Sequence, residues 1–147
     1  MSFILFSREK LYVRVHANAM EVTDLLKNRT IYRESNRKFS IDRMLIADFH
    51  AAEEHLKTVA EEVTDSGSRW LKPAYDFLVQ YAVDLGDGMC EVEKRALRDS
   101  AEHAGAQNVF IVPYTDKLSN EQALQKLLLA LKGEKFMPPD LIGPVIK

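Results

Sequence analysis

The sequence predicts an α/β domain in which helices cover a mixed five-stranded sheet, and two observations carry this prediction. The first is a series of short segments near the start of the chain that suit an antiparallel meander. The second is a strand, helix, strand and helix order farther along, which is typical of a parallel crossover. We expect residues 1–133 of the 147-residue chain to form one domain, and the proline-containing residues 134–147 to form a tail.

Three strands are expected before residue 35. Residues 11–16 alternate apolar and polar side chains, which is the period of a half-buried strand. Residues 20–26 and 30–32 are candidates for the second and third strands. Asn18 and Asn28 lie between these segments and suit turns, because asparagine tolerates a positive φ.

Two helices are expected on the sheet. Apolar residues recur at three- or four-residue steps over residues 49–63, and Asp48 is placed to cap the N-terminus of this helix. A second helix should begin near Glu91 and end at Gly105. The face that it buries is expected to comprise Val92, Ala96, Leu97, Ser100 and Ala104.

Two more strands and a third helix complete the prediction. Residues 75–85 predict a central strand because they are rich in aromatic and β-branched side chains, and residues 109–112 predict a short buried strand. Ser119 and Gln122 form the pattern of a capping box for the last helix, which Gly133 ends. A leucine stripe on this helix is expected to cover a sheet face rather than form a groove for a partner; it comprises Leu124, Leu127, Leu128 and Leu131.

Composition limits the function and the location. The net charge of −2, without a long run of one sign, argues against a nonspecific nucleic-acid binder. The single cysteine, Cys90, fits a reducing compartment, and no apolar run approaches the ~20 residues that span a bilayer. We therefore expect a cytoplasmic protein. The apolar residues 3–6 suit an edge strand or a loose terminus better than a membrane contact.

A calcium loop is not expected at residues 84–88, although two aspartates and two glycines lie there. An EF-hand loop requires an oxygen ligand at its third position and a glutamate at its twelfth. Counted from Asp84, these positions hold Gly86 and Arg95. A turn that leads into the following helix is the better interpretation.

The histidines and the cysteine form no recognisable catalytic or metal-binding pattern. His50 and His55 are five residues apart, whereas two ligands on one helix face are four apart. Cys90 lies near a helix N-terminus, which can favour a thiolate, but His103 is too far along the same helix to act as its base. The sequence therefore predicts no catalytic residue, no cofactor and no metal ligand.

Three segments in order share their patterns with one known family. Residues 91–112 combine a charged helix, an Ala-Gly-Ala turn and a strand, while residues 45–56 contain the run Leu-Ile-Ala-Asp-Phe and residues 6–15 a first strand. Together they resemble MreB, the bacterial actin-like shape protein, and would make this chain a degenerate, half-length relative. The resemblance implies a ribonuclease H-like fold, corresponding to one subdomain of actin.

The motifs that hold ATP in this family are altered. Where the family reads D-L-G-T-A-N after its first strand, this chain reads Arg-Val-His-Ala-Asn over residues 14–18. Arg14 cannot hold Mg²⁺ as an acid does, and the side chain of His16 would crowd a phosphate. The E-E-P carboxylates are likewise replaced by residues 113–115. We also expect the second phosphate loop and the second half of the actin fold to be absent.

The resemblance without its phosphate chemistry implies a non-enzymatic domain that binds protein. It would pair with itself or with a full-length actin-like protein, and so modulate filaments or cell shape. One alternative is a nucleotide- or anion-binding domain that a partner chain completes, with Arg14 and His16 on the phosphate. Another is a small enzyme that uses Cys90 or a histidine.

Overall fold

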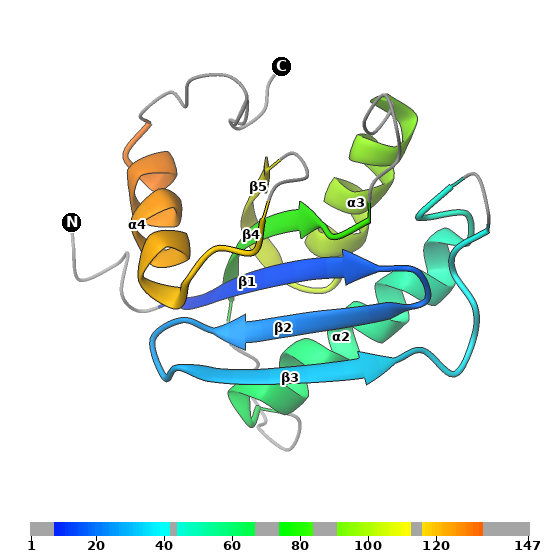
Figure 1. Ribbon diagram of the computed structural model, residues 1–147, viewed down its shortest axis with the longest axis horizontal. Coiled ribbons are helices and arrows are strands. Elements are labelled where there is room, and N and C mark those ends of the chain that lie inside the picture. Colours follow the sequence, from blue (N-terminus) through cyan, green and yellow to red (C-terminus); the bar gives the residue numbers. More distant parts are fainter. Residues whose placement is uncertain (1–7, 42–43, 67–73, 84–90, 113–115, 134–147) are drawn as a thin grey trace.

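The computed structural model describes residues 8–41, 44–66, 74–83, 91–112 and 116–133, which form an α/β fold (Figure 1). Its strands are β1 (Glu9–His16), β2 (Ala19–Asp24), β3 (Arg29–Glu34), β4 (Tyr75–Tyr81) and β5 (Ala106–Val112). Its helices are α2 (Phe49–Thr64), α3 (Glu91–His103) and α4 (Asn120–Leu131).

The five strands form one mixed sheet in the order β3-β2-β1-β4-β5. β1, β2 and β3 are antiparallel neighbours, whereas β4 is parallel to both β1 and β5. The expected antiparallel meander and parallel strand–helix–strand unit are therefore confirmed. β1 lies in the centre, where it joins the two halves of the sheet.

Helices cover both faces of the sheet. α2 and α3 pack on one face, where the core includes Val13 of β1, Val22 of β2 and Phe77 of β4 (Figure 1). α4 packs on the other face, where Leu127 belongs to a cluster with Tyr12 of β1 and other apolar residues of β4 and β5. The expectation that the last helix covers a sheet face is confirmed.

Local turn and cap chemistry behaves as expected. Asn18 and Asn28 adopt φ values of 57° and 56° in the two hairpin turns. The Asp48 side chain accepts the Ala51 N–H at the start of α2, and both reciprocal hydrogen bonds of the Ser119 capping box are present in α4. These signals fix element ends because each donor and acceptor lies within three residues of the other.

The predicted burial of α3 is wrong at one position. Val92 was expected in the core but is 67% exposed, while Glu93 beside it is buried. A carboxylate oxygen of Glu93 accepts the Ile46 N–H at 2.8 Å, so the polar side chain has a partner inside. The buried stripe therefore starts at Glu93 rather than Val92. Leu97 and Ser100 lie on it as expected, Ala104 is buried just beyond the helix, and Ala96 is partly buried.

Strand ends differ by a few residues from the predictions. β2 ends at Asp24 because Asp24 Oδ1 accepts the N–H groups of Leu26 and Lys27, which turns the chain toward β3. β5 begins three residues earlier than expected, and β3 extends from Arg29 to Glu34. The predicted features at residues 3–6, 84–90, 113–115 and 134–147, Cys90 among them, lie outside the described residues.

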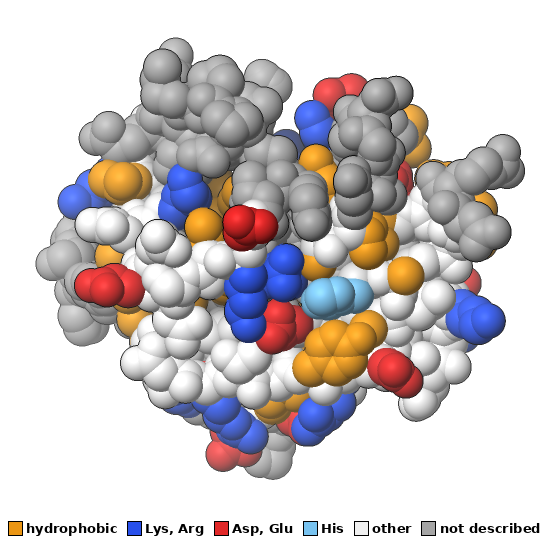
Figure 2. All heavy atoms as spheres, viewed as in Figure 1, with side chains coloured by type: hydrophobic (Ala, Val, Ile, Leu, Met, Phe, Trp, Pro, Cys, Tyr) orange, Lys and Arg blue, Asp and Glu red, His pale blue; other side chains and the backbone are white. Residues whose placement is uncertain are grey.

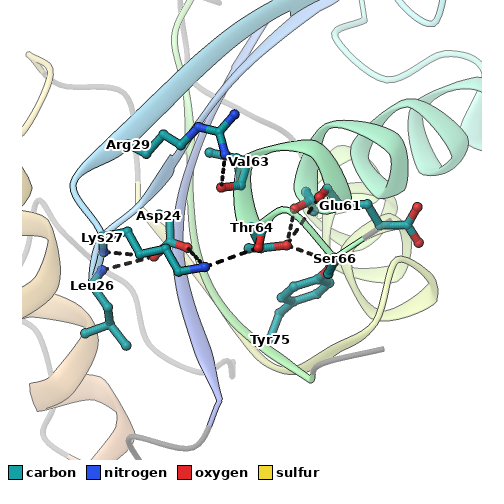
Figure 3. Close-up of polar contacts among 10 residues, drawn as sticks. Asp24, Leu26, Lys27, Arg29, Glu61, Val63, Thr64, Ser66 and Tyr75 are labelled. Carbon is teal, nitrogen blue, oxygen red and sulfur yellow. Dashed lines mark hydrogen bonds and ion pairs between the residues drawn. The ribbon is translucent and has the colours of Figure 1, made fainter. Parts of the chain in front are cut away.

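Cations from the β2–β3 turn cap the C-terminal end of α2 (Figure 3). Lys27 Nζ donates to the Thr64 carbonyl at 3.2 Å, and Arg29 Nη1 reaches the Val63 carbonyl at 3.5 Å. The last carbonyls of a helix have no partner within it, and they carry the negative end of its dipole. The two basic side chains therefore fix α2 against the hairpin.

A buried group of charges joins the first residues of β1 and β4. Asp76 is fully buried, and its carboxylate accepts from Lys10 Nζ at 2.8 Å and from Arg8 Nε at 2.9 Å. Asn108 Nδ2 donates to the same carboxylate at 2.8 Å. Lys10 is itself fully buried and also donates to the Arg8 carbonyl. Removal of the Asp76 carboxylate would take away the buried anion that Lys10 and Arg8 share.

We expect Asp76→Asn to destabilise the protein strongly. The substitution keeps the shape of the side chain but leaves the buried Lys10 ammonium without its charged partner, which costs roughly 3–5 kcal/mol of unfolding free energy. Urea denaturation measures the loss. The control Asn108→Ala removes a neutral donor from the same carboxylate and should cost about 1 kcal/mol. Equal losses in the two variants would contradict a dominant role for charge pairing.

Leu127→Ala should show whether α4 belongs to the core. Leu127 is fully buried against the sheet, so its truncation should cost about 2–5 kcal/mol in urea denaturation. Leu129 lies on the same helix but is exposed, and Leu129→Ala should change stability by no more than about 0.5 kcal/mol. A small loss for both variants would mean that α4 contributes little to the fold.

Candidate functional site

Arg14 and His16, the two residues at which the sequence departs from the phosphate-binding motif that it resembles, lie at the C-terminal end of β1. Both are on the face of the sheet that carries α4, because alternate strand residues share a face with Tyr12. Glu21 of β2 is opposite Arg14 on one side, and Gln80 of β4 is opposite it on the other. Figure 2 shows basic, acidic and histidine side chains adjoining one another over these strands.

Arg14 is fixed from both sides. Its Nε donates to Gln80 Oε1 at 3.0 Å, and its Nη1 lies 3.7 Å from Glu21 Oε1. The Tyr12 hydroxyl donates to the same Gln80 oxygen, which therefore accepts two hydrogen bonds. The guanidinium is thus held between side chains of the two neighbouring strands and has a partner for its charge.

A second cation meets the same carboxylate. Lys117, from the segment that precedes α4, places Nζ 2.9 Å from Glu21 Oε2. The next residue along, Leu118, donates its N–H to the Tyr12 hydroxyl at 3.1 Å. Burial raises the pKa of that Tyr12 hydroxyl, so it remains a neutral donor at physiological pH. These contacts join the start of α4 to β1 and β2.

His16 completes the site beside an exposed aromatic ring. Its imidazole meets the Tyr32 ring edge-on, with centroids 5.4 Å apart, and Tyr32 is 49% exposed. The His16 Nε2 atom is buried and makes no hydrogen bond. Burial, followed by the positive charge of Arg14, lowers the pKa of His16, and Glu21 opposes this shift. The imidazole is therefore neutral at pH 7.

The remaining histidines lie elsewhere. The Phe49 ring at the start of α2 contacts both His50 and His103, with centroid distances of 5.4 and 5.5 Å. His55 lies farther along α2, near Phe39. In the part of the chain that the structure describes, no group of three or more histidine, cysteine or acidic residues could hold a metal ion.

Sequence reasoning missed three residues of the site: Glu21, Gln80 and Lys117. Gln80 sits within a mostly apolar strand, and Glu21 and Lys117 resemble ordinary surface charges. Their roles follow from strand register, which places residues 66 apart in the chain within hydrogen-bond distance. A fully buried glutamine in a central strand needs a partner, and this was the one available signal.

Two comparisons with known proteins were made at the level of sequence. No protein-family model matches the chain, and the comparison with curated proteins gives no match. Over the described ranges, the structure has no helix that is long and apolar enough to cross a membrane.

The site combines paired charges with a neutral imidazole and an exposed aromatic ring. Its charges are largely paired with one another, and its imidazole is neutral. The exposed Tyr32 ring lies against the half-buried His16, and Glu21 lies between Tyr32 and Arg14 in the sheet. Tyrosine and arginine are enriched among the residues that contribute most to protein–protein binding. No nucleophile with an adjacent base is present among these residues.

The lowered pKa of His16 predicts a pH-dependent stability. The unfolded chain binds a proton near pH 6.5, whereas folded His16 binds one only at lower pH. The contribution of His16 is therefore present above pH 6.5 and is lost as the pH falls through the folded pKa. His16→Gln should reduce the difference in urea midpoint between pH 7.5 and pH 5.5. An unchanged difference in this variant would assign the pH dependence to other groups.

Proposed function

We propose that this chain is a non-catalytic, MreB-related domain that acts by binding protein. It corresponds to one actin-like subdomain of the ribonuclease H-like type, and its action is on actin-like filaments or cell shape. The strand order β3-β2-β1-β4-β5, with an antiparallel meander followed by parallel strands, supports the fold part of this proposal. The sequence resemblance of residues 45–56 and 91–112 supports it independently.

The state of Arg14 carries the proposal. In the actin-type site, an acid at this position organises Mg²⁺ and a glycine two residues later leaves room for phosphate. Here the position holds a guanidinium fixed by Gln80 and Glu21, and His16 fills the place of the glycine. A fixed positive charge repels Mg²⁺, and the pairing with Glu21 leaves no free carboxylate to attract the metal. The arrangement favours loss of the ATPase chemistry.

A second function, anion binding completed by a partner chain, has one observation in its favour. The buried Nε2 of His16 makes no hydrogen bond and lies on the same strand as Arg14. A phosphate could accept from the imidazole and from the guanidinium at once. Glu21 argues against anion binding, because its carboxylate would repel a phosphate. This carboxylate already accepts a hydrogen bond from Lys117 and lies close to Arg14. Protein binding remains the better supported proposal.

Calorimetric titration with ATP and Mg²⁺ tests the proposal. We expect no binding at micromolar concentrations and no phosphate release, because the metal-holding acid is replaced by Arg14. Micromolar binding with turnover would refute the non-catalytic assignment. Stabilisation against melting by phosphate, but not by NaCl of equal ionic strength, would favour the anion-binding alternative if Arg14→Gln abolished it.

Cosedimentation with polymerised MreB-type protein tests the filament part. We expect the chain to pellet with filaments, and we expect Tyr32→Ser to reduce the pelleted fraction because the exposed ring is lost. Leu129→Ser, which removes another exposed apolar side chain on a different element, is the matched control and should pellet normally. Absence of pelleting for the unchanged protein would exclude the filament as its partner.

A further inference from the structure

One side of the β3 backbone pairs with none of the strands that the structure describes. β3 forms one edge of the sheet and, among the described strands, pairs with β2 alone (Figure 1). The Ser35 N–H donates to the Asn18 carbonyl at 2.9 Å, so these residues form a hydrogen-bonded pair of the antiparallel ladder. Hydrogen-bonded and non-hydrogen-bonded pairs alternate along such a ladder. The N–H and C=O groups of Ile31 and Arg33 therefore face β2.

The same alternation directs the remaining backbone groups outward. The N–H and C=O groups of Thr30, Tyr32 and Glu34 face away from β2, on the open edge of the sheet. The β1–β2 ladder agrees with this phase, because the Leu25 N–H donates to the Lys10 carbonyl at 2.8 Å. All three outward residues have exposed side chains.

The charged residues of β3 do not block this edge. Arginines often protect edge strands by projecting across them. Here Arg29 reaches back to the Val63 carbonyl, and Arg33 forms an ion pair with Glu62 of α2. Arg33 Nη1 also donates to the Tyr32 carbonyl, but a carbonyl oxygen can accept a second hydrogen bond. The outward groups of β3 therefore remain available to another strand.

The sequence of β3 is complementary to itself in one register. An antiparallel pair of identical edge strands, related by a two-fold axis, places residues of the same sheet face opposite each other. A pair centred on Ile31 sets Arg29 against Arg33, and a pair centred on Arg33 sets that residue against its own copy. A pair centred on Tyr32 sets Thr30 against Glu34 and avoids opposed like charges.

We propose that a second copy of this chain docks along β3 in the antiparallel register centred on Tyr32. The two five-stranded sheets then form one continuous sheet, and the Tyr32 rings of the two copies lie side by side at the two-fold axis. This inference rests on the proposed protein-binding function and names its partner. A contact through one edge strand is smaller than the ~1,200 Å² of a stable interface, so we expect a Kd of roughly 10–1,000 μM.

Sedimentation velocity of the full chain across this concentration range tests the pairing. Glu34→Pro removes an outward N–H that the folded monomer does not use, whereas Glu34→Ala keeps it. We expect Glu34→Ala to dimerise like the unchanged protein and Glu34→Pro to weaken dimerisation by about tenfold or more. Circular dichroism establishes that both variants are folded. If Glu34→Pro does not fold, Tyr32→Arg replaces it, since like charges at the axis should also prevent pairing.

Disulfide formation tests the register of the two β3 strands directly. In a Cys90→Ser background, Tyr32→Cys places two thiols opposite each other across the axis, within the separation that a disulfide spans. We expect this variant to form a disulfide-linked dimer on oxidation, and Glu34→Cys to form much less, because Glu34 is opposite Thr30 of the second copy.

Two results would overturn the inference: a monomer at every concentration, or a dimer that is indifferent to Glu34→Pro and Tyr32→Arg. A monomer that also fails to bind ATP would leave the proposed function standing with a different protein as partner. ATP turnover would refute the proposed function whatever the oligomeric state.

Discussion

The fold depends on satisfying the polar side chains of β1, a strand that is buried on both faces. One face of β1 is apolar, but the other carries Lys10, Tyr12 and Arg14 into the interior or its margin. Each of these finds its partner on β4, where Asp76 accepts from Lys10 and Gln80 accepts from the other two. Unpaired polar groups would be costly at these positions. The polar pairs therefore fix the register of the parallel strands, which apolar packing alone would specify less strictly.

Sequence reasoning succeeded where the determining groups are close along the chain. Asn18, Asn28 and Ser119 mark turns and a helix start because their side chains act on their own segment. It failed at Val92 and Glu93, since the amide that makes Glu93 a buried residue belongs to Ile46, 47 residues away. The prediction that β1 is half-buried was also wrong. A polar side chain within a strand, such as that of Tyr12, suggests a solvent-facing position when its distant partner is not known.

The sequence indicated where the candidate site lies, but it did not indicate which residues contact one another there. Arg14 and His16 could be singled out because, in the motif that residues 14–18 resemble, these two positions hold an acid and a glycine. The contacts that give them their chemistry come from Glu21, Gln80 and Lys117, on three other segments of the chain. In these contacts two cations, Arg14 and Lys117, share the Glu21 carboxylate. Under the proposed function, the same substitutions that remove a metal-binding acid would also supply a polar surface for a partner.

The parallel pairing of β1 and β4 also affects how the chain must be synthesised. Lys10 meets Asp76 across 66 residues, so Lys10 is synthesised roughly 3–13 s before its partner. During this interval β1 would be an edge strand, and the face that carries Lys10 and Arg14 would be exposed to water. We expect the lysine and arginine on it to keep this nascent edge hydrated and to discourage adhesion to other emerging chains. The same charges would then protect the chain from aggregation before β4 pairs with β1.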